Sequence, residues 1–383
     1  MTAIHSKTGK NDLRSEAPRK TGSADQVVGQ RNRWTTRLKM SNIGAVYVLI
    51  AEIIIFSLWA PSTFPNMATV KQVLDGNAIT ALAALALLVP LSAGVFDLSF
   101  AYTMSLSGVT AAHFVVTNHT SVPLAIVIGI LVAMIVGVIN GIVVVVLKVD
   151  SFIGTLGTGS LVQAFISYVT HDNPINSLKL AGAFTSVSQH VVGGLVVVVY
   201  WAVALAVVLW LFMQYSSTGR RLYASGFNPE AAKLASVRVD RLRFLSLITS
   251  SAIAGFAGAM LASSLSSGSP SAGTSYLLPA FAASFVGATQ FKRDRMNAWG
   301  TVVAVLMLGT GTVGLGLVSA PLWAPQMFTG VVLLAALAAS SLQHRNLLAG
   351  SAIWRGGAGI IRALIGRKGD PASAESKKRV TEI

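Results

Sequence analysis

Apolar stretches of membrane-spanning length alternate with short polar segments along most of the chain. At about 20 residues for each crossing, the chain has room for about ten helices that cross a bilayer. The predicted fold is therefore an all-α polytopic membrane protein, with a transmembrane domain over residues 43–342. The apolar stretches cover residues 43–60, 77–94, 100–116, 123–147, 151–170, 191–213, 244–264, 277–291, 298–317 and 323–342.

The composition supports this prediction and excludes several classes of protein. Apolar residues make up 53% of the 383 residues and charged residues only 11%, which excludes a water-soluble globule. The chain has no cysteine, so it cannot form disulfides, thiolate zinc sites or iron–sulfur clusters.

The net charge of +15 is informative because of where the basic residues lie. If the amino terminus is cytoplasmic, all basic residues except Lys71 and Lys179 lie on the cytoplasmic side of the membrane. The positive-inside rule favours this arrangement, so both termini are predicted to be cytoplasmic. Nucleic-acid binding is not expected, because the charge is dispersed over several loops and has no aromatic stacking surface. The inner basic residues lie in a disordered arm (1–42), in the segments 148–150, 214–243 and 292–297, and in a basic tail (343–383).

Two glycine-rich segments resemble nucleotide-binding motifs, but neither has the required context. The segment from Gly154 to Ser160 lacks the lysine of a phosphate-binding loop, and the segment from Gly309 to Gly314 is not preceded by a strand. Glycine pairs such as Gly255 and Gly258 are better explained by close packing of membrane helices. We therefore expect no cofactor and no ATP hydrolysis by this chain itself.

Two carboxylates lie within the apolar stretches, Glu52 and Asp97. A charge inside a bilayer is costly and is usually functional, so an ion-coupled secondary transporter or facilitator that uses both residues is one alternative. Asp97 and Ser99 also lie just before the third predicted helix, where their oxygens can accept hydrogen bonds from its free N–H groups. Capping is the favoured interpretation for Asp97.

The polar segment 216–243 contains a strong helix-start signal. Asn228 is a good N-cap, Pro229 suits the first helical position, and Glu230 complements the positive end of the helix dipole. We expect a short helix from Asn228 to Ser236 whose small apolar residues enter the groove of a partner. A solvated connector with one capped turn is the alternative.

Four motifs, in this order along the chain, resemble those of the ribose and simple-sugar branch of ATP-binding-cassette (ABC) importer permeases. They are the segment from Val95 to Ser99, the Gly-x-x-Asn-Gly pattern that ends at Gly141, the helix opening at Ser151, and the segment 219–232. The resemblance covers roughly residues 43–342.

The resemblance implies the permease fold of this family, a location in the bacterial inner membrane, and a non-catalytic role in sugar import. It also implies three partners: a cytoplasmic ATP-binding subunit, a periplasmic solute-binding protein, and a second permease, either identical or a paralogue. A translocation path or helix break is implied at Asp97, Ser99, Asn140 and Thr155. The loop that contacts the ATPase is implied at Gly219, Arg220, Tyr223, Gly226, Asn228, Pro229, Glu230, Ala231 and Ala232.

The chain departs from the family pattern at several glycines. Ala101 stands where the family has glycine after Asp-Leu-Ser, and a glycine-rich stretch becomes Gly287-Ala-Thr followed by the charged segment 292–296. Bulkier residues cannot adopt the same tight backbone approach without cost. Either this turn lies in cytoplasmic water, or the chain pairs with a non-identical permease.

A membrane-embedded enzyme is the third class of protein we considered. The six histidines never fall at a metal-ligand spacing, and no carboxylate stands near a plausible nucleophile within one apolar stretch. We therefore predict no catalytic residue and no metal site.

Overall fold

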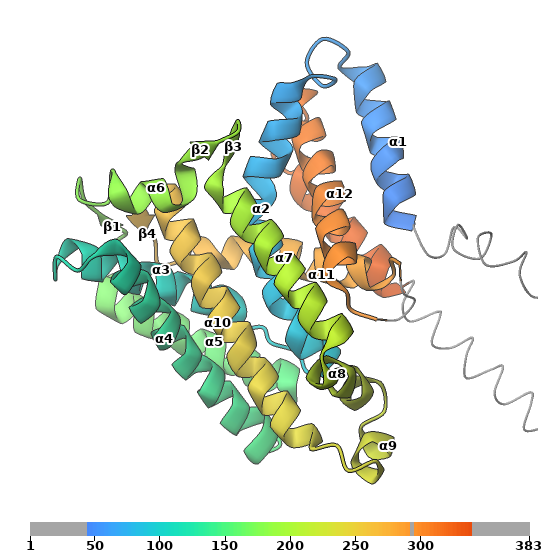
Figure 1. The fold of residues 1–383 in the computed structure, drawn as a ribbon. Helices are drawn as coiled ribbons and strands as arrows, with labels where there is room; N and C mark the ends of the chain where they lie inside the picture. The colour runs from blue at the N-terminus through green and yellow to red at the C-terminus, as the bar shows by residue number, and fades with distance from the viewer. Residues whose placement is uncertain (1–43, 292–294, 339–383) are drawn as a thin grey trace, which may run out of the picture. The chain divides into compact units, whose positions relative to one another are not determined.

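The computed structural model describes residues 44–291 and 295–338, and this part of the chain is mostly helical (Figure 1). The arm 1–42 and the tail 343–383 lie outside the described residues. The longer helices are α1 (Gly44–Trp59), α2 (Met67–Ser92), α3 (Phe100–Val116), α4 (Val122–Gly141), α5 (Ser151–Thr170), α7 (Val197–Tyr215), α10 (Val239–Leu265), α11 (Leu277–Ala288), α12 (Ala298–Leu317) and a final helix, Ala324–Ala338.

Shorter elements connect these helices, and they include four strands that an all-α prediction did not anticipate. Strands β1 (Ile175–Asn176) and β4 (Ser267–Gly268) form one antiparallel pair, and β2 (Val191–Val192) and β3 (Leu195–Val196) form another. The remaining helical turns are η1 (Ile142–Val146), α6 (Ala183–Gln189), α8 (Ser217–Phe227), α9 (Pro229–Leu234) and η2 (Ala272–Tyr276).

Six helices of the described chain are long and apolar enough to cross a membrane: α2, α4 with η1, α5, α7, α10 and α12. Four further apolar helices have 10–17 residues: α1, α3, η2 with α11, and the final helix. Each of the ten predicted stretches thus contains an apolar helix, although only six of these helices reach spanning length.

Two helix boundaries differ from the predicted stretches for local reasons. Helix α2 begins at Met67 and not at residue 77, because the Asn66 side chain caps it by accepting from the N–H of Ala68 at 2.6 Å. The stretch 191–213 opens with the β2–β3 hairpin, in which Gly193 and Gly194 take positive φ angles of 57° and 86°, so that α7 starts only at Val197.

Helix α2 forms the centre of the hydrophobic core. The seven consecutive residues from Leu82 to Leu88 are all 0% exposed, and a run of this length faces every side of the helix. A helix that is apolar and buried all round must be enclosed by other helices, and α2 contacts α7, α10, α11 and α12. Helix α4 instead exposes a row of large apolar side chains that includes Leu131 and Ile135, as expected for a surface in contact with lipid.

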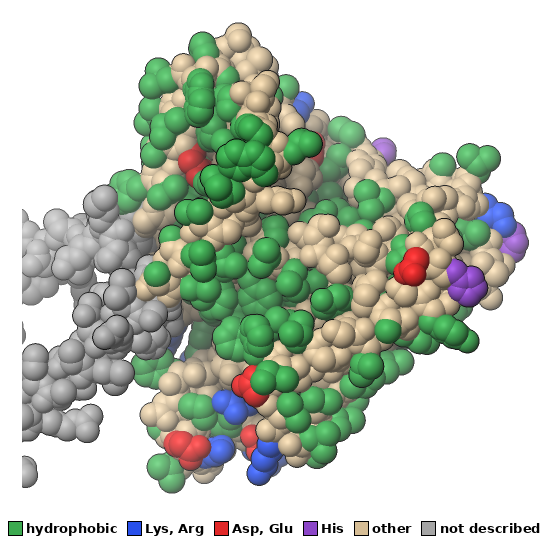
Figure 2. Space-filling view, turned by 180° about the vertical axis from the view of Figure 1, so that it is seen from behind, with side chains coloured by type: hydrophobic (Ala, Val, Ile, Leu, Met, Phe, Trp, Pro, Cys, Tyr) green, Lys and Arg blue, Asp and Glu red, His purple; other side chains and the backbone are tan. Residues whose placement is uncertain are grey.

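The described basic side chains lie mostly at one end of the helices. At this end α4 meets the start of α10, and a Cβ on Gly141 would lie 2.6 Å from the Phe244 ring. Figure 2 shows several charged side chains gathered at this end. At the opposite end, Lys71 lies beside Gly194, and Lys179 donates to the carbonyl of Val116. The basic residues at the first end are Lys148, Arg220, Arg221, Lys233, Arg238, Arg241, Arg243 and Arg295.

The close packing of α3 on α10 depends on Gly258, as the glycine spacing predicted. A Cβ at this position would overlap the carbonyl group of Met104, so the two helices must separate if the residue carries a side chain. We expect Gly258→Ala to cost about 1 to 3 kcal/mol of stability, as overpacked sites do.

The measurement is thermal unfolding of the detergent-solubilised chain, and Gly157→Ala is the matched control. Gly157 is also helical, but no atom lies within 4 Å of a Cβ built on it. Equal unfolding midpoints for the two variants would contradict the close-packing assignment.

Candidate functional site

The chain loses helical structure between α2 and α3, and the break is stabilised by side chains from α5. Residues 95–98 have no helical structure, and Gly94 precedes them with a positive φ of 72°. The N–H of Phe96 donates to Ser151 Oγ at 3.1 Å, and the N–H of Leu98 donates to Thr155 Oγ1 at 2.9 Å. The first two turns of α5 therefore satisfy two backbone groups that the break leaves without helical partners.

A buried polar cluster lies directly after this break. Asp97 Oδ1 accepts from the backbone N–H of Ser99 at 3.1 Å and from its hydroxyl at 2.7 Å. Asn140 of α4 donates through Nδ2 to Ser99 Oγ at 2.6 Å. Asp97, Ser99, Asn140 and Thr155 are each 0% exposed, so the structure brings the four predicted residues together at a helix break and not along an open path.

The predicted capping of α3 is correct for Asp97 and wrong for Ser99. Asp97 accepts from the N–H of Ser99, the residue that precedes the first turn of α3. The Ser99 side chain makes no capping hydrogen bond, because its hydroxyl is already held between the Asp97 carboxylate and the Asn140 amide.

Two further residues beside the cluster, Ser250 and Ser251 of α10, were not predicted from the sequence. Both are 0% exposed, and Ser250 lies next to the Asp97 carboxylate. A pair of serines inside an otherwise apolar helix was the available signal, but serines are common at helix contacts in membranes and the sequence does not show what they face.

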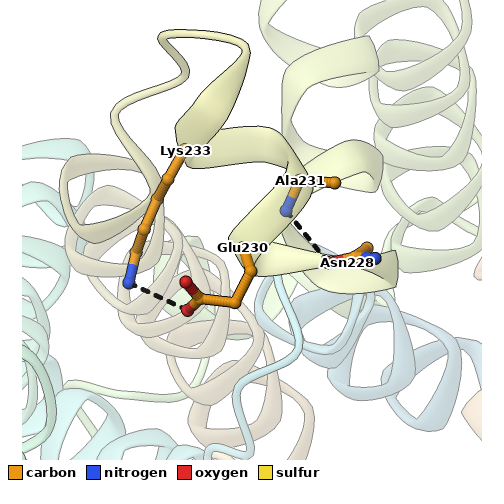
Figure 3. Close-up of polar contacts among 4 residues, drawn as sticks. All are labelled: Asn228, Glu230, Ala231 and Lys233. Carbon is orange, nitrogen blue, oxygen red and sulfur yellow. Dashed lines mark hydrogen bonds and ion pairs between the residues drawn. The ribbon is translucent and has the colours of Figure 1, made fainter.

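The short helix predicted at Asn228 is present as α9. Figure 3 shows the Asn228 side chain accepting from the N–H of Ala231, at 3.0 Å. Glu230 pairs with Lys233 at 3.3 Å, and both side chains are exposed, so the pair adds little stability. The helix ends at Leu234, two residues before its predicted end, because Ser236 takes a positive φ of 60°.

The preceding helix, α8, was not predicted, and it joins the α9 region to the break. Its start is capped by Ser216, whose Oγ accepts from the N–H of Gly219 at 2.8 Å. Near its end, Gly226 packs so closely on Ser92 and Gly94 that a Cβ would overlap the Ser92 carbonyl oxygen. Because glycine removes this obstacle, the end of α8 rests directly on the backbone where α2 ends.

Two other contacts tie this region to the membrane helices. Arg243, in the first turns of α10, donates through Nε to the carbonyl of Ala93 at 3.4 Å. The Tyr223 hydroxyl of α8 donates to the carbonyl of Met296, and the Arg295 guanidinium lies 5.2 Å from the centre of the same ring. Burial raises the pKa of Tyr223 to about 12 although Arg295 opposes the shift, so the phenol stays protonated and can donate at neutral pH.

The segment after α11, where the family's glycines are replaced, is held by amide side chains. Gln290 is 2% exposed, and its Oε1 accepts from the N–H of Ala45 at 2.9 Å. Asn297 Nδ2 donates to the carbonyl of Gln290 at 2.9 Å, and its Oδ1 caps α12. Residues 292–294 lie outside the described part, so the two alternatives for this turn stay open.

Glu52 is not part of the polar cluster. It lies in α1, which packs on α12, whereas Asp97 lies among residues of α3, α4, α5 and α10. Glu52 is 8% exposed, and neither of its carboxylate oxygens has a hydrogen-bond partner in the described chain. Over the same residues, no group of three or more His, Asp or Glu side chains could hold a metal ion.

Comparison with known proteins identifies the family. Residues 71–337 match the family described as the branched-chain amino acid transport system / permease component. The chain belongs to this permease family. This result confirms the resemblance noted in the sequence and identifies the protein as a multi-pass membrane transport permease.

Several relatives of the permease have known names. The ribose import permease protein RbsC of Bacillus subtilis is 32% identical, over 78% of this chain and 92% of its own. The L-arabinose transport system permease protein AraH of Escherichia coli is 30% identical, over 77% and 88%. The D-allose transport system permease protein AlsC of the same species is 25% identical, over 78% and 91%. No solved structure matches the permease significantly.

The hydroxyl of Thr155 is predicted to control the stability of the break. We expect Thr155→Val to keep the side-chain shape but to leave the N–H of Leu98 without its acceptor, at a cost of about 1 to 3 kcal/mol. Hydrogen–deuterium exchange should then become faster at the amides of residues 96–98.

The matched control is Thr158→Val, because the hydroxyl of Thr158 donates only to Gly154, within its own helix, at 3.0 Å. Unchanged exchange at residues 96–98 in Thr155→Val, or an equal increase in both variants, would contradict the assignment.

Proposed function

We propose that this permease is the membrane subunit of an ABC importer for a monosaccharide or a related small polar solute. The relatives named for ribose, L-arabinose and D-allose support this solute class. The proposal includes a bacterial inner-membrane location, a separate cytoplasmic ATPase, a periplasmic solute-binding protein, and a second permease that is either a copy or a paralogue.

The proposed topology has ten membrane helices and two cytoplasmic termini. Six apolar helices of spanning length and four shorter ones support the helix count. The end that carries α8, α9 and most described basic residues becomes the cytoplasmic end under the positive-inside rule. Lys71 and Lys179 then lie at the periplasmic end.

The contact of α8 with the α2–α3 break is the single observation that carries the mechanism. Helix α9 presents the exposed Glu230 at the basic end, where an ATPase would bind. A displacement of α8–α9 by that ATPase acts on Ser92 and Gly94 through Gly226, because the backbones touch there. Arg243 gives α10 a second connection to the same segment. Movement of the break would then change which side of the membrane the path opens to.

An ion-coupled secondary transporter remains the second candidate. The observation in its favour is Glu52, which is buried in α1 and has no hydrogen-bond partner in the part of the chain that the structure describes. In this case the isolated chain would take up solute under an ion gradient, and Glu52→Gln would abolish that uptake.

Coupling to ATP is tested by reconstituting the permease with its ATPase and binding protein in vesicles. We expect uptake to require ATP on the ATPase side. We also expect the double variant Asn228→Ala with Glu230→Arg to lose uptake while ATP hydrolysis continues, because it lacks the α9 cap and reverses an exposed charge at the proposed docking surface. Loss of an N-cap destabilises a helix by about 1 kcal/mol.

Asn66→Ala is the matched control, since it removes the N-cap of α2 at the opposite end of the molecule. It should retain ATP-driven uptake. Uptake by the permease alone, driven by an ion gradient, would refute the ABC assignment.

The topology is tested with single cysteines, because the natural chain has none. A membrane-impermeant maleimide should label Lys233→Cys only in inside-out vesicles and Leu178→Cys only in right-side-out vesicles. Both positions are exposed, Leu178 at 92%. The reverse labelling pattern would overturn the proposed orientation.

A further inference from the structure

Four buried side-chain oxygens around the helix break have no hydrogen-bond partner in the described chain. They are Asp97 Oδ2, Asn140 Oδ1, Ser250 Oγ and Ser251 Oγ. Each of these residues is 0% exposed, so bulk water does not reach them. Buried polar atoms without partners are rare in folded proteins because each costs free energy, and four in one region require a physical cause.

These oxygens belong to one region of the structure. Asp97 and Asn140 approach the same atom, Ser99 Oγ, at 2.7 and 2.6 Å. Ser250 is close enough to interact with the Asp97 carboxylate, although its Oγ makes no hydrogen bond of normal distance and angle. Ser251 faces α4 one turn before Asn140, where its Oγ would lie 2.9 Å from a Cβ on Gly137. The segment before α3, helix α4 and helix α10 therefore each contribute side chains to one group of buried polar residues.

The charge of Asp97 is not balanced by any side chain that the structure describes. The only ion pair over these residues joins Lys233 to Glu230. Arg243 is a nearby base on α10, but its Nε donates to the carbonyl of Ala93. An isolated carboxylate inside a membrane protein is very costly, so a positive species must accompany it or it must lose its charge.

The unpartnered oxygens also indicate what kind of species fits. Asp97 Oδ2 and the carbonyl oxygen Asn140 Oδ1 can only accept hydrogen bonds or bind a cation. The two serine hydroxyls can rotate so that their lone pairs point toward the same cation. One carboxylate and three neutral oxygens supply a single negative charge, which suits a hard monovalent cation. A divalent ion such as Ca²⁺ usually takes six to eight oxygens with several carboxylates.

We propose that Asp97, Asn140, Ser250 and Ser251 bind one small monovalent cation, of the size of Na⁺, at the helix break. The ion joins the segment before α3 to α4 and α10 and neutralises Asp97. It is a fixed structural ion and not a transported one. This site goes beyond the transport function proposed above.

The test uses the full-length chain, purified in detergent, and measures thermal unfolding in NaCl and in choline chloride at equal ionic strength. We expect Na⁺ to raise the unfolding midpoint in a saturable manner, because a ligand that binds the folded state stabilises it. Binding of radioactive ²²Na⁺ at equilibrium should reach one ion for each chain.

Three variants assign the effect to these residues. Asp97→Asn removes the charge with little change in shape and should abolish the Na⁺-dependent shift and ²²Na⁺ binding. Ser250→Ala should raise the half-saturating Na⁺ concentration by about tenfold or more, and it keeps the test decisive if Asp97→Asn does not fold. Ser284→Ala is the matched control, because Ser284 is a buried serine of α11 whose hydroxyl donates to the carbonyls of Ala84 and Ala280, and this variant should respond to Na⁺ like the natural chain.

Two results would overturn the proposal. One is a midpoint that does not depend on Na⁺ in the natural chain, together with no ²²Na⁺ binding. If an infrared carboxylic-acid band then disappeared in Asp97→Asn, Asp97 would instead be neutralised by a proton. The other is an equal Na⁺ response in the natural chain, Asp97→Asn and Ser250→Ala.

Discussion

The fold depends on satisfying the backbone polar groups that a break between two membrane helices leaves without partners. Inside a bilayer water cannot do this, so irregular backbone is tolerated only where protein groups replace the helical hydrogen bonds. Ser151 and Thr155 accept from the N–H groups of Phe96 and Leu98, and Asp97 accepts from that of Ser99. These bonds permit a non-helical segment in the interior of the helix assembly and fix α5 beside it.

The same segment is also where the membrane helices meet α8. The contact of Gly226 with Ser92 and Gly94 is backbone on backbone, so in the proposed mechanism it passes on a displacement of α8 without the freedom of a flexible side chain. The buried cluster around Asp97 lies a few residues further along the chain. The proposed motor contact, the break and the proposed cation site are therefore three parts of one continuous structure, and a change at one of them alters the surroundings of the others.

The sequence predicted parts of this site because some signals are local. Asn228, Pro229 and Glu230 form a helix start through bonds within a few residues, and α9 begins where they predict. The resemblance of motifs selected Asp97, Ser99, Asn140 and Thr155, which the structure brings together. Helix α8 was missed because it is amphipathic and short, and its glycines suggest a loop until their packing partners are known. Ser250 and Ser251 were missed because a serine in an apolar helix has no distinctive local pattern.

The sequence alone determined that this protein lies in a membrane, that it is built of apolar helices, and that its basic residues favour one side, because hydropathy and charge act on each segment separately. Only the tertiary structure decided which polar atoms are buried together, that Ser99 bonds across to α4, and that α8 rests on the end of α2. Those contacts join residues that are tens to more than a hundred positions apart. Their energy depends on distances of a few ångströms that no single segment specifies.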